Sequence, residues 1–172
     1  MEQFTGAVRA CLAAENWYGA LMIALILPDI CGKLEHPTLR SQARYTRWYE
    51  AYVLNGPEFT GDPDSPRYRY PTAGDCYLLR CAIVHEGSEE VSDTKTKVVL
   101  GRYHFFAPER DLKFFGHQSR NIGQLPVDKF CEKMCLGVDH WTDIVLKATP
   151  ELLQRSENLI RIRRHRDEGF QL

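Results

Sequence analysis

The chain has 172 residues, of which 44% are hydrophobic and 26% are charged, and its formal net charge is -1. This length suits one domain, residues 1–172, with a hydrophobic core, and the composition excludes a disordered chain. Because the net charge is close to zero, contact with a nucleic acid would require a local basic patch.

The first segment, residues 2–34, is expected to be helical, with a break at Asn16 or Gly19 that divides it in two. Its apolar run WYGALMIALILPDIC stops after about 15 residues and contains Pro28 and Asp29, whereas a membrane span needs about 20. The amino terminus lacks the basic start and unbroken apolar stretch of a secretory signal. We therefore expect a buried helix, no membrane partner and a cytoplasmic protein.

A second helix is expected from about Thr38 to Gly56, followed by a proline-rich loop. Three of its side chains lie within about 60° on one face, namely Arg40, Arg44 and Arg47. Three others group on another face, namely Tyr45, Tyr49 and Tyr52. With Arg69 in the loop, these residues suit phosphate binding and base stacking in an RNA site. The alternative is a solvated arginine face with the tyrosines packed in the core.

The segment PTAGDCYLLRCAIVHEGS predicts a helix with Thr72 as its N-cap. At about 100° per residue, Arg80 lies on the apolar face and His85 is about 140° further round. A buried guanidinium without a partner costs several kcal/mol, which is about the scale of breaking a buried ion pair, so Arg80 must meet a carboxylate, backbone carbonyls, a ligand or a second subunit. Asp29 is the structural candidate, because it too is a charge within an apolar helix.

The second half of the chain adds one strand and two helices. The β-branched and aromatic run from Thr96 to Phe106 predicts a strand, or half of a hairpin. A helix is expected from Pro126 to about Lys147, and a last one from near Pro150. The core face of the helix that begins at Pro126 is marked by four residues at helical spacing, namely Phe130, Met134, Val138 and Trp141. The predicted fold is mainly α, a bundle of about five helices with a small β insertion near 96–106.

Six cysteines occur in the chain, and we interpret them as small buried apolar residues. Only Cys131 and Cys135, with His140 beyond them, have a spacing worth testing for a metal. Zinc sites usually need four ligands, and the usual paired-cysteine spacing is absent. We therefore expect no metal and no other cofactor.

Arg80 and His85 together suit phosphodiester chemistry. The guanidinium can bind phosphate oxygens through paired hydrogen bonds, and the imidazole can transfer protons near neutral pH. RNA supplies its own nucleophile in the 2′-hydroxyl group, so this chemistry needs no metal ion.

The segment RCAIVH, from Arg80 to His85, resembles the motif of the HEPN superfamily, an arginine and a histidine separated by four to six residues. The resemblance implies a helical bundle, often a homodimer, in which paired motifs form a metal-independent ribonuclease site. It also implies a bacterial defence, toxin or mobile-element system, with RNA or a toxin/antitoxin-type protein as partner. Four longer segments also resemble a family of small bacterial and phage proteins, namely DCYLLRCAIVHEGS, LPDICG, RYTRWYEAYV and VDKFCEKMCLGVDHW. This second resemblance implies no activity.

Two functions follow from this resemblance. In the first, the protein is a ribonuclease in which Arg80 stabilises the phosphate and His85 is the general acid or base. In the second, it is a non-catalytic HEPN-like interaction module, and Arg80 forms a buried structural ion pair. Cys81 departs from the motif and favours the second function, because active members of the superfamily usually carry Asn, Asp or His directly after the arginine.

Overall fold

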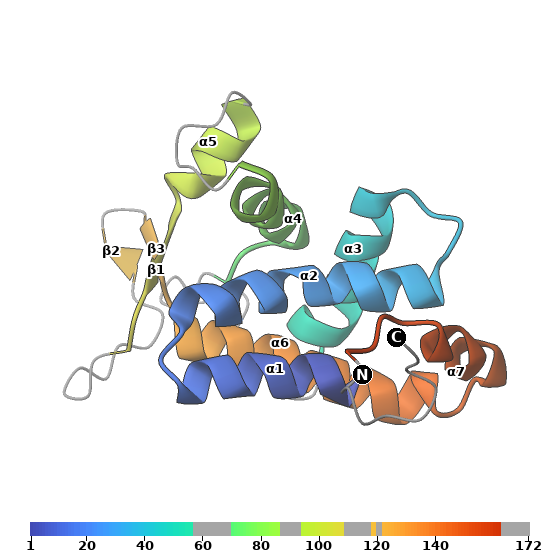
Figure 1. The fold of residues 1–172 in the computed structure, drawn as a ribbon. Helices are drawn as coiled ribbons and strands as arrows, with labels where there is room; N and C mark the ends of the chain where they lie inside the picture. The colour runs from blue at the N-terminus through green and yellow to red at the C-terminus, as the bar shows by residue number, and fades with distance from the viewer. Residues whose placement is uncertain (57–69, 87–93, 109–117, 120–121, 163–172) are drawn as a thin grey trace, which may run out of the picture.

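The computed structural model describes residues 1–56, 70–86, 94–108, 118–119 and 122–162. Within these ranges, seven α-helices form a bundle and three short strands form a small sheet at one end of it (Figure 1). The predicted fold class, mainly α with a small β insertion, is confirmed.

The first two helices are separated by a tight turn at the predicted place. Helix α1 spans Glu2–Ala13 and helix α2 spans Trp17–Glu35. Between them Glu15 has a φ of 54°, in the left-handed region, and the side chain of Asn16 accepts a 3.0 Å hydrogen bond from the Gly19 backbone N–H. This N-cap fixes the start of α2.

Helix α2 is the central element of the bundle. It contacts α1, α3, α4, α6 and α7. By length and composition alone α2 is apolar enough to cross a membrane, but 56% of its most apolar window is buried among the other helices. The prediction of a buried core helix is therefore confirmed.

Helix α3 spans Ser41–Tyr49 and continues as a π-helical turn, η1, at Glu50–Leu54. It packs closely on α2 at Gly32, where an added Cβ atom would lie 2.7 Å from the backbone oxygen of Arg44. Two buried hydroxyl groups fasten α3 to its surroundings. Tyr45 donates a 3.1 Å hydrogen bond to the oxygen of Leu25, and Tyr49 donates one of 3.2 Å to the oxygen of Pro71.

Helix α4 spans Ala73–Cys81 and also continues as a π-helical turn, η2, at Ala82–Glu86. The predicted N-cap is confirmed, because Oγ1 of Thr72 accepts a 3.1 Å hydrogen bond from the Asp75 backbone N–H. Residues 87–93, which follow η2, are outside the described part of the chain.

The predicted strand from Thr96 to Phe106 is wrong in its first half. Residues Thr94–Leu100 form helix α5, in which Thr96 and Val99 are buried three residues apart, a helical spacing. Strand β1 follows at Tyr103–Phe106 and lies beside β3, Ile122–Pro126, in parallel rather than in a hairpin. The two-residue strand β2, Gln118–Ser119, pairs antiparallel with β3, so the strand order is β1-β3-β2.

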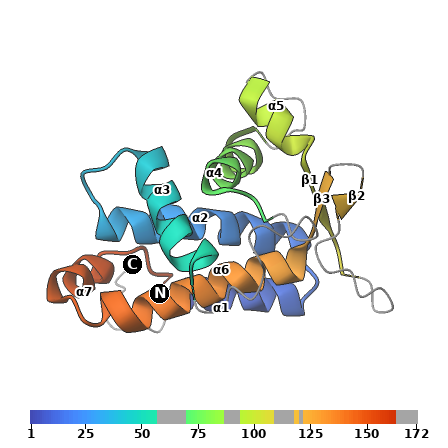
Figure 2. The same cartoon turned by 180° about the vertical axis from the view of Figure 1, so that it is seen from behind.

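Three further elements close the bundle. They are helix α6 at Val127–Trp141, the π-helical turn η3 at Thr142–Leu146 and helix α7 at Pro150–Glu157. Figure 2 shows α6 running alongside α1 and α2. Arg9 joins α1 to α6, because one of its nitrogens lies 2.7 Å from Glu132 and 2.8 Å from Asp139.

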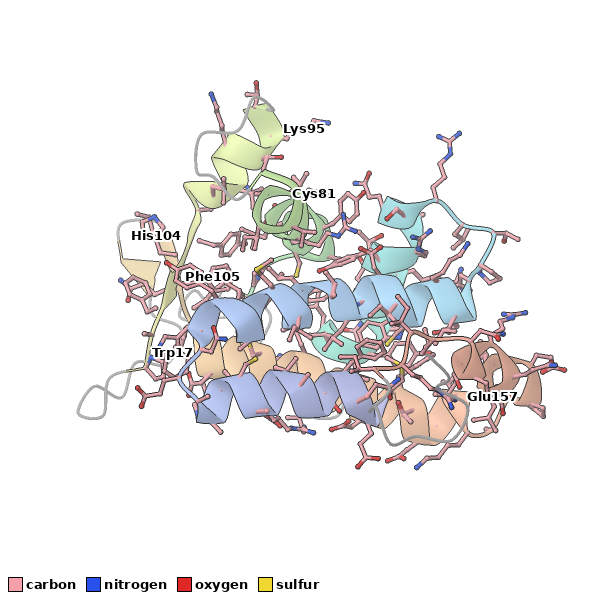
Figure 3. The ribbon with its side chains drawn as sticks, in the orientation of Figure 1. Trp17, Cys81, Lys95, His104, Phe105 and Glu157 are labelled. Carbon is pink, nitrogen blue, oxygen red and sulfur yellow. The ribbon has the colours of Figure 1, made fainter. Side chains whose placement is uncertain are left out.

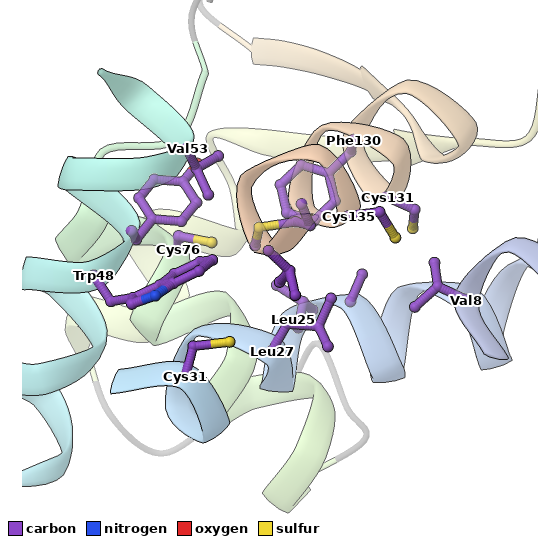
Figure 4. Packing of buried hydrophobic residues seen from close by; sticks show 14 of the residues in the cluster. Val8, Leu25, Leu27, Cys31, Trp48, Val53, Cys76, Phe130, Cys131 and Cys135 are labelled. Atoms are coloured by element: carbon purple, nitrogen blue, oxygen red, sulfur yellow. The ribbon is translucent and has the colours of Figure 1, made fainter. Parts of the chain in front are cut away.

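The core lies between α1, α2, α3, α4 and α6 (Figure 4). The four predicted core residues of α6 are all buried, so their assignment is confirmed. Trp48 and Trp141 meet edge to face, with ring centroids 6.2 Å apart, where α3 and α6 converge. Large aromatic side chains at this junction fix the spacing of the two helices.

Candidate functional site

Asp29 is the centre of a polar cluster where α2, α3 and α4 meet. Its Oδ2 atom lies 2.7 Å from Nε of Arg80 on α4, and its Oδ1 atom accepts a 3.0 Å hydrogen bond from Oγ of Ser41 on α3. Nη2 of Arg44 lies 3.7 Å from the same Oδ1 atom. We call Asp29, Ser41, Arg44 and Arg80 the Asp29 cluster. Asp29 was the structural candidate for the partner of Arg80, whereas the sequence did not indicate the contacts of Ser41 and Arg44.

The cluster is largely shielded from water. The exposed fraction of the side chain is 11% for Asp29, 16% for Arg80 and 20% for Arg44. Burial alone lowers the pKa of Arg80, but the charge of Asp29 raises it and the net shift is upward, so the guanidinium stays protonated. Each charge here needs an opposite charge, because an unpaired ion at such a site is costly.

The position of Arg80 follows from the faces of α4. Cys76 and Leu79 are buried on the core side, and Arg80 lies next to this face, towards α2. Nη1 of Arg80 is 3.9 Å from Sγ of Cys81, which is labelled in Figure 3. Burial raises the pKa of the neighbouring Tyr77, while a hydrogen bond with Ser41 acts in the opposite direction.

The π-helical turn changes the expected relation between Arg80 and His85. In a regular α-helix, residues five apart point about 140° away from each other. In a π-helix the backbone hydrogen bonds run between residues five apart, which brings such residues closer to one above the other. The predicted angle of about 140° assumed a regular α-helix throughout, whereas Ala82–Glu86 is π-helical. The side chain of His85 lies outside the described part of the structure.

The predicted arginine stripe is not uniform. Arg40 and Arg47 are exposed, as a phosphate-binding surface requires. Arg44 instead approaches Asp29, and its Nη1 atom donates a 3.4 Å hydrogen bond to the backbone oxygen of Leu39. Arg69 belongs to residues 57–69, which are outside the described ranges.

Two of the three tyrosines in this segment are not available for base stacking. Tyr45 and Tyr49 are fully buried, and their hydroxyl groups are bonded inside the core. Tyr52 donates a 3.1 Å hydrogen bond to Oε1 of Glu35. The alternative interpretation, in which these tyrosines belong to the core, is therefore confirmed for Tyr45 and Tyr49, whereas Tyr52 is only partly buried.

Glu35 forms a second cluster that the sequence did not indicate. Besides the bond from Tyr52, its Oε2 atom accepts a 2.9 Å hydrogen bond from Nε1 of Trp141. Burial, followed by the charge of Glu35, raises the pKa of Tyr52 to about 12. The carboxylate therefore ties the end of α2 to η1 and α6, which is a structural role.

A shallow cavity of about 260 Å³ lies at the amino-terminal end of α4. It is lined by Thr72, Asp75, Arg102 and Tyr103. The hydroxyl group of Tyr103 donates a 3.0 Å hydrogen bond to Asp75, and Nη1 of Arg102 lies 3.9 Å from the same carboxylate. The two charged side chains that line the cavity, Asp75 and Arg102, therefore already form an ion pair with each other.

The prediction that the cysteines are buried holds for four of the six, because Cys11 and Cys81 are only partly buried. Cys131 and Cys135 point into the core from α6 (Figure 4). Burial raises the pKa of each of these thiols to about 12, so both stay protonated near neutral pH. Across the described ranges, no group of three or more His, Cys, Asp or Glu residues is arranged to hold a metal ion.

Comparison of the chain with protein-family models, with curated proteins and with solved structures gave no match in any of the three.

Proposed function

We propose that the protein is a non-catalytic, HEPN-like interaction module of the cytoplasm, in which Arg80 is a structural residue. The observation that carries this proposal is the 2.7 Å ion pair between Nε of Arg80 and Oδ2 of Asp29. The pair joins α4 to the central helix α2 at a site where both side chains are mostly buried.

The ion pair argues against phosphate binding by Arg80. A substrate phosphate would have to compete with a carboxylate that α2 already holds beside the guanidinium. A buried carboxylate that lost its cationic partner would also be strongly destabilised. In a ribonuclease site, by contrast, the guanidinium must be free to stabilise the negative charge that develops on the phosphate.

A ribonuclease is the second candidate, and the π-helical turn at Ala82–Glu86 favours it. Single π-helical turns at the end of an α-helix are frequently found at functional sites, and this one contains the second half of the Arg80 to His85 motif. Cleavage would then use Arg80 for the phosphate and His85 for proton transfer.

Incubation of the purified protein with mixed RNA in the presence of a chelator separates these two functions. We expect no cleavage that depends on His85, so that the protein and its His85→Ala variant give the same RNA pattern. Arg161→Gln, at an exposed position, is the control variant. Loss of cleavage in His85→Ala, with cleavage retained in Arg161→Gln, would overturn the non-catalytic proposal.

The partners of the module follow from the resemblance alone. We propose that it forms a homodimer and binds either RNA or a toxin/antitoxin-type protein. Sedimentation velocity at several concentrations tests the homodimer, because a monomer at all of them would contradict it.

A further inference from the structure

One face of the small sheet is turned to solvent. Along β1, Tyr103 is buried and Phe105 packs on Phe130 of α6, with ring centroids 5.2 Å apart. His104 and Phe106 alternate with these residues and are exposed. Figure 3 shows His104 and Phe105 on opposite sides of the strand. The sheet thus packs on the helices with one face and exposes two aromatic rings on the other.

The exposed face continues from β1 onto β3. His104 is in register with Gln124 and Phe106 with Pro126, and partners in register point to the same side of a sheet. The rings of His104 and Phe106 have centroids 6.4 Å apart. We call His104, Phe106, Ile122, Gln124 and Pro126 the outer sheet face, since Ile122 precedes Gln124 by two residues. None of these five described residues is acidic, so they do not repel an anion.

Three cationic side chains border the outer sheet face. Lys95 and Lys97 are exposed on α5, the helix that leads into β1. Arg102 lies at the start of β1, where its backbone oxygen accepts a 2.6 Å hydrogen bond from the Gly123 N–H. The described segment 94–108 therefore has three basic residues and no acidic one, although the net charge of the chain is -1.

The side chain of Arg102 is accessible to an anion, because 52% of it is exposed. Its charged neighbour among the described residues is Asp75, whose Oδ1 atom lies 3.9 Å from Nη1. A good hydrogen bond of this type is about 2.7–3.2 Å long, so the ion pair is loose. Arg102 also lines the cavity of about 260 Å³ at the amino-terminal end of α4, which leaves room for a ligand beside the guanidinium.

We propose that the outer sheet face binds single-stranded RNA. The bases of a single strand are unpaired and stack on aromatic side chains, and His104 and Phe106 provide two such rings. The amide of Gln124, in register with His104, has both a donor and an acceptor for a base edge. Arg102 and the two lysines of α5 supply positive charge for the phosphates.

This assignment rests on RNA as the proposed partner of the module and adds the surface that holds it. It places the RNA near the amino-terminal end of α4, whereas Arg80 lies in the last turn of that helix. RNA binding at the outer sheet face therefore needs no contribution from the Asp29 cluster and no cleavage.

Fluorescence anisotropy with a short labelled oligouridine, in the presence of EDTA, measures the affinity and its dependence on salt. Arg102→Gln should reduce the slope of log affinity against log salt by about 0.7, the value for one phosphate contact of a single strand. Phe106→Leu keeps an apolar side chain but removes the ring. It should weaken binding at least about fivefold and leave the slope unchanged, because the stacking of one base is lost.

His104→Ala is a second stacking variant, and it should behave like Phe106→Leu. The matched controls are Arg161→Gln and Ile144→Ala, which remove an exposed charge and an exposed apolar side chain away from the sheet (Figure 1). Both controls should bind RNA like the unchanged protein. Circular dichroism of each variant shows that a loss of binding is not a loss of the fold.

RNA binding that is equal in Arg102→Gln, His104→Ala and Phe106→Leu would overturn the assignment of this surface and leave RNA as a partner. No saturable binding of RNA would overturn both. Binding of phosphatidylserine vesicles without binding of RNA would identify a membrane surface and would also overturn the proposal. Cleavage that depends on His85 would overturn only the non-catalytic function, so these failures can be told apart.

Discussion

At the residue scale, the two partners of the ion pair between Arg80 and Asp29 differ in what their replacement leaves behind. Replacing Arg80 leaves Asp29 with Ser41 and Arg44 nearby, whereas replacing Asp29 removes the carboxylate that both guanidinium groups approach. Breaking a fully buried ion pair costs about 3–5 kcal/mol. Because these side chains are partly exposed, we expect a smaller loss in the free energy of unfolding. We also expect the replacement of Asp29 to cost more than the replacement of Arg80.

We therefore predict that Asp29→Asn lowers the free energy of unfolding by about 3 kcal/mol, and Arg80→Met by about half as much. Urea unfolding followed by circular dichroism measures both changes. Arg47→Met, at an exposed position of α3, should change stability by less than about 0.5 kcal/mol. Equal small effects at all three positions would mean that the ion pair contributes nothing to stability.

At the scale of elements, the close packing of α2 and α3 depends on Gly32. An added methyl group would lie 2.7 Å from the backbone oxygen of Arg44, and backbone cannot move aside as a flexible side chain can. Gly6 is the matched control, because it also lies within a helix, but a Cβ atom added there meets nothing within 4 Å.

Gly32→Ala is expected to lower the free energy of unfolding by about 1–3 kcal/mol through overpacking. Gly6→Ala should instead raise it by about 0.5–1 kcal/mol, since alanine favours the helix. Thermal or urea unfolding of both variants gives the sign of each change. A gain in stability in Gly32→Ala would show that α3 can shift away from α2 without cost.

The sequence predicted the features that depend on local chemistry. Thr72 as an N-cap and the apolar face of α6 are properties of a few neighbouring residues, and both are confirmed. Asp29 was also a candidate partner of Arg80, because a charge in an apolar helix needs an opposite charge, and the two side chains do pair.

Other features depend on contacts that a local pattern does not contain. The β-branched residues between Thr94 and Leu100 favour a strand, but burial of Thr96 and Val99 in the bundle selects a helix. The π-helical register of Ala82–Glu86 differs from the α-helix that an apolar pattern indicates. The approach of Arg44 to Asp29 likewise requires the packing of α3 on α2, which no motif specifies.

At the scale of the whole molecule, buried thiols make stability depend on alkaline pH. Burial raises the pKa of Cys76, Cys131 and Cys135 to about 12 each, from an ordinary value near 9. Between pH 9 and 12 these thiols keep their protons in the folded protein and lose them in the unfolded chain. The unfolded state then binds fewer protons, so the free energy of unfolding falls as the pH rises.

Over part of this pH range, Lys133 makes the free energy of unfolding rise with pH, in contrast to the thiols. Burial lowers its pKa to about 8, from an ordinary value near 10.5. Between these two values the unfolded chain binds a proton that the folded protein does not, so this side chain makes stability rise with pH. Burial also raises the pKa of the Cys31 thiol, so four thiols and one lysine leave a net fall in stability between pH 9 and about 10.5. The fall is steeper above that range, where buried Tyr45 and Tyr49, whose pKa values are raised by burial, add to it.

We predict that Cys131→Ala makes the fall between pH 9 and 10.5 shallower by about 1.4 kcal/mol per pH unit, the value for one proton. Lys133→Met should make it steeper by a similar amount, because the opposing contribution is lost. Urea unfolding at intervals of half a pH unit, under reducing conditions, gives both slopes. A slope that is the same in Cys131→Ala as in the unchanged protein would contradict the prediction, since the Cys131 thiol would then titrate alike in the folded and unfolded states.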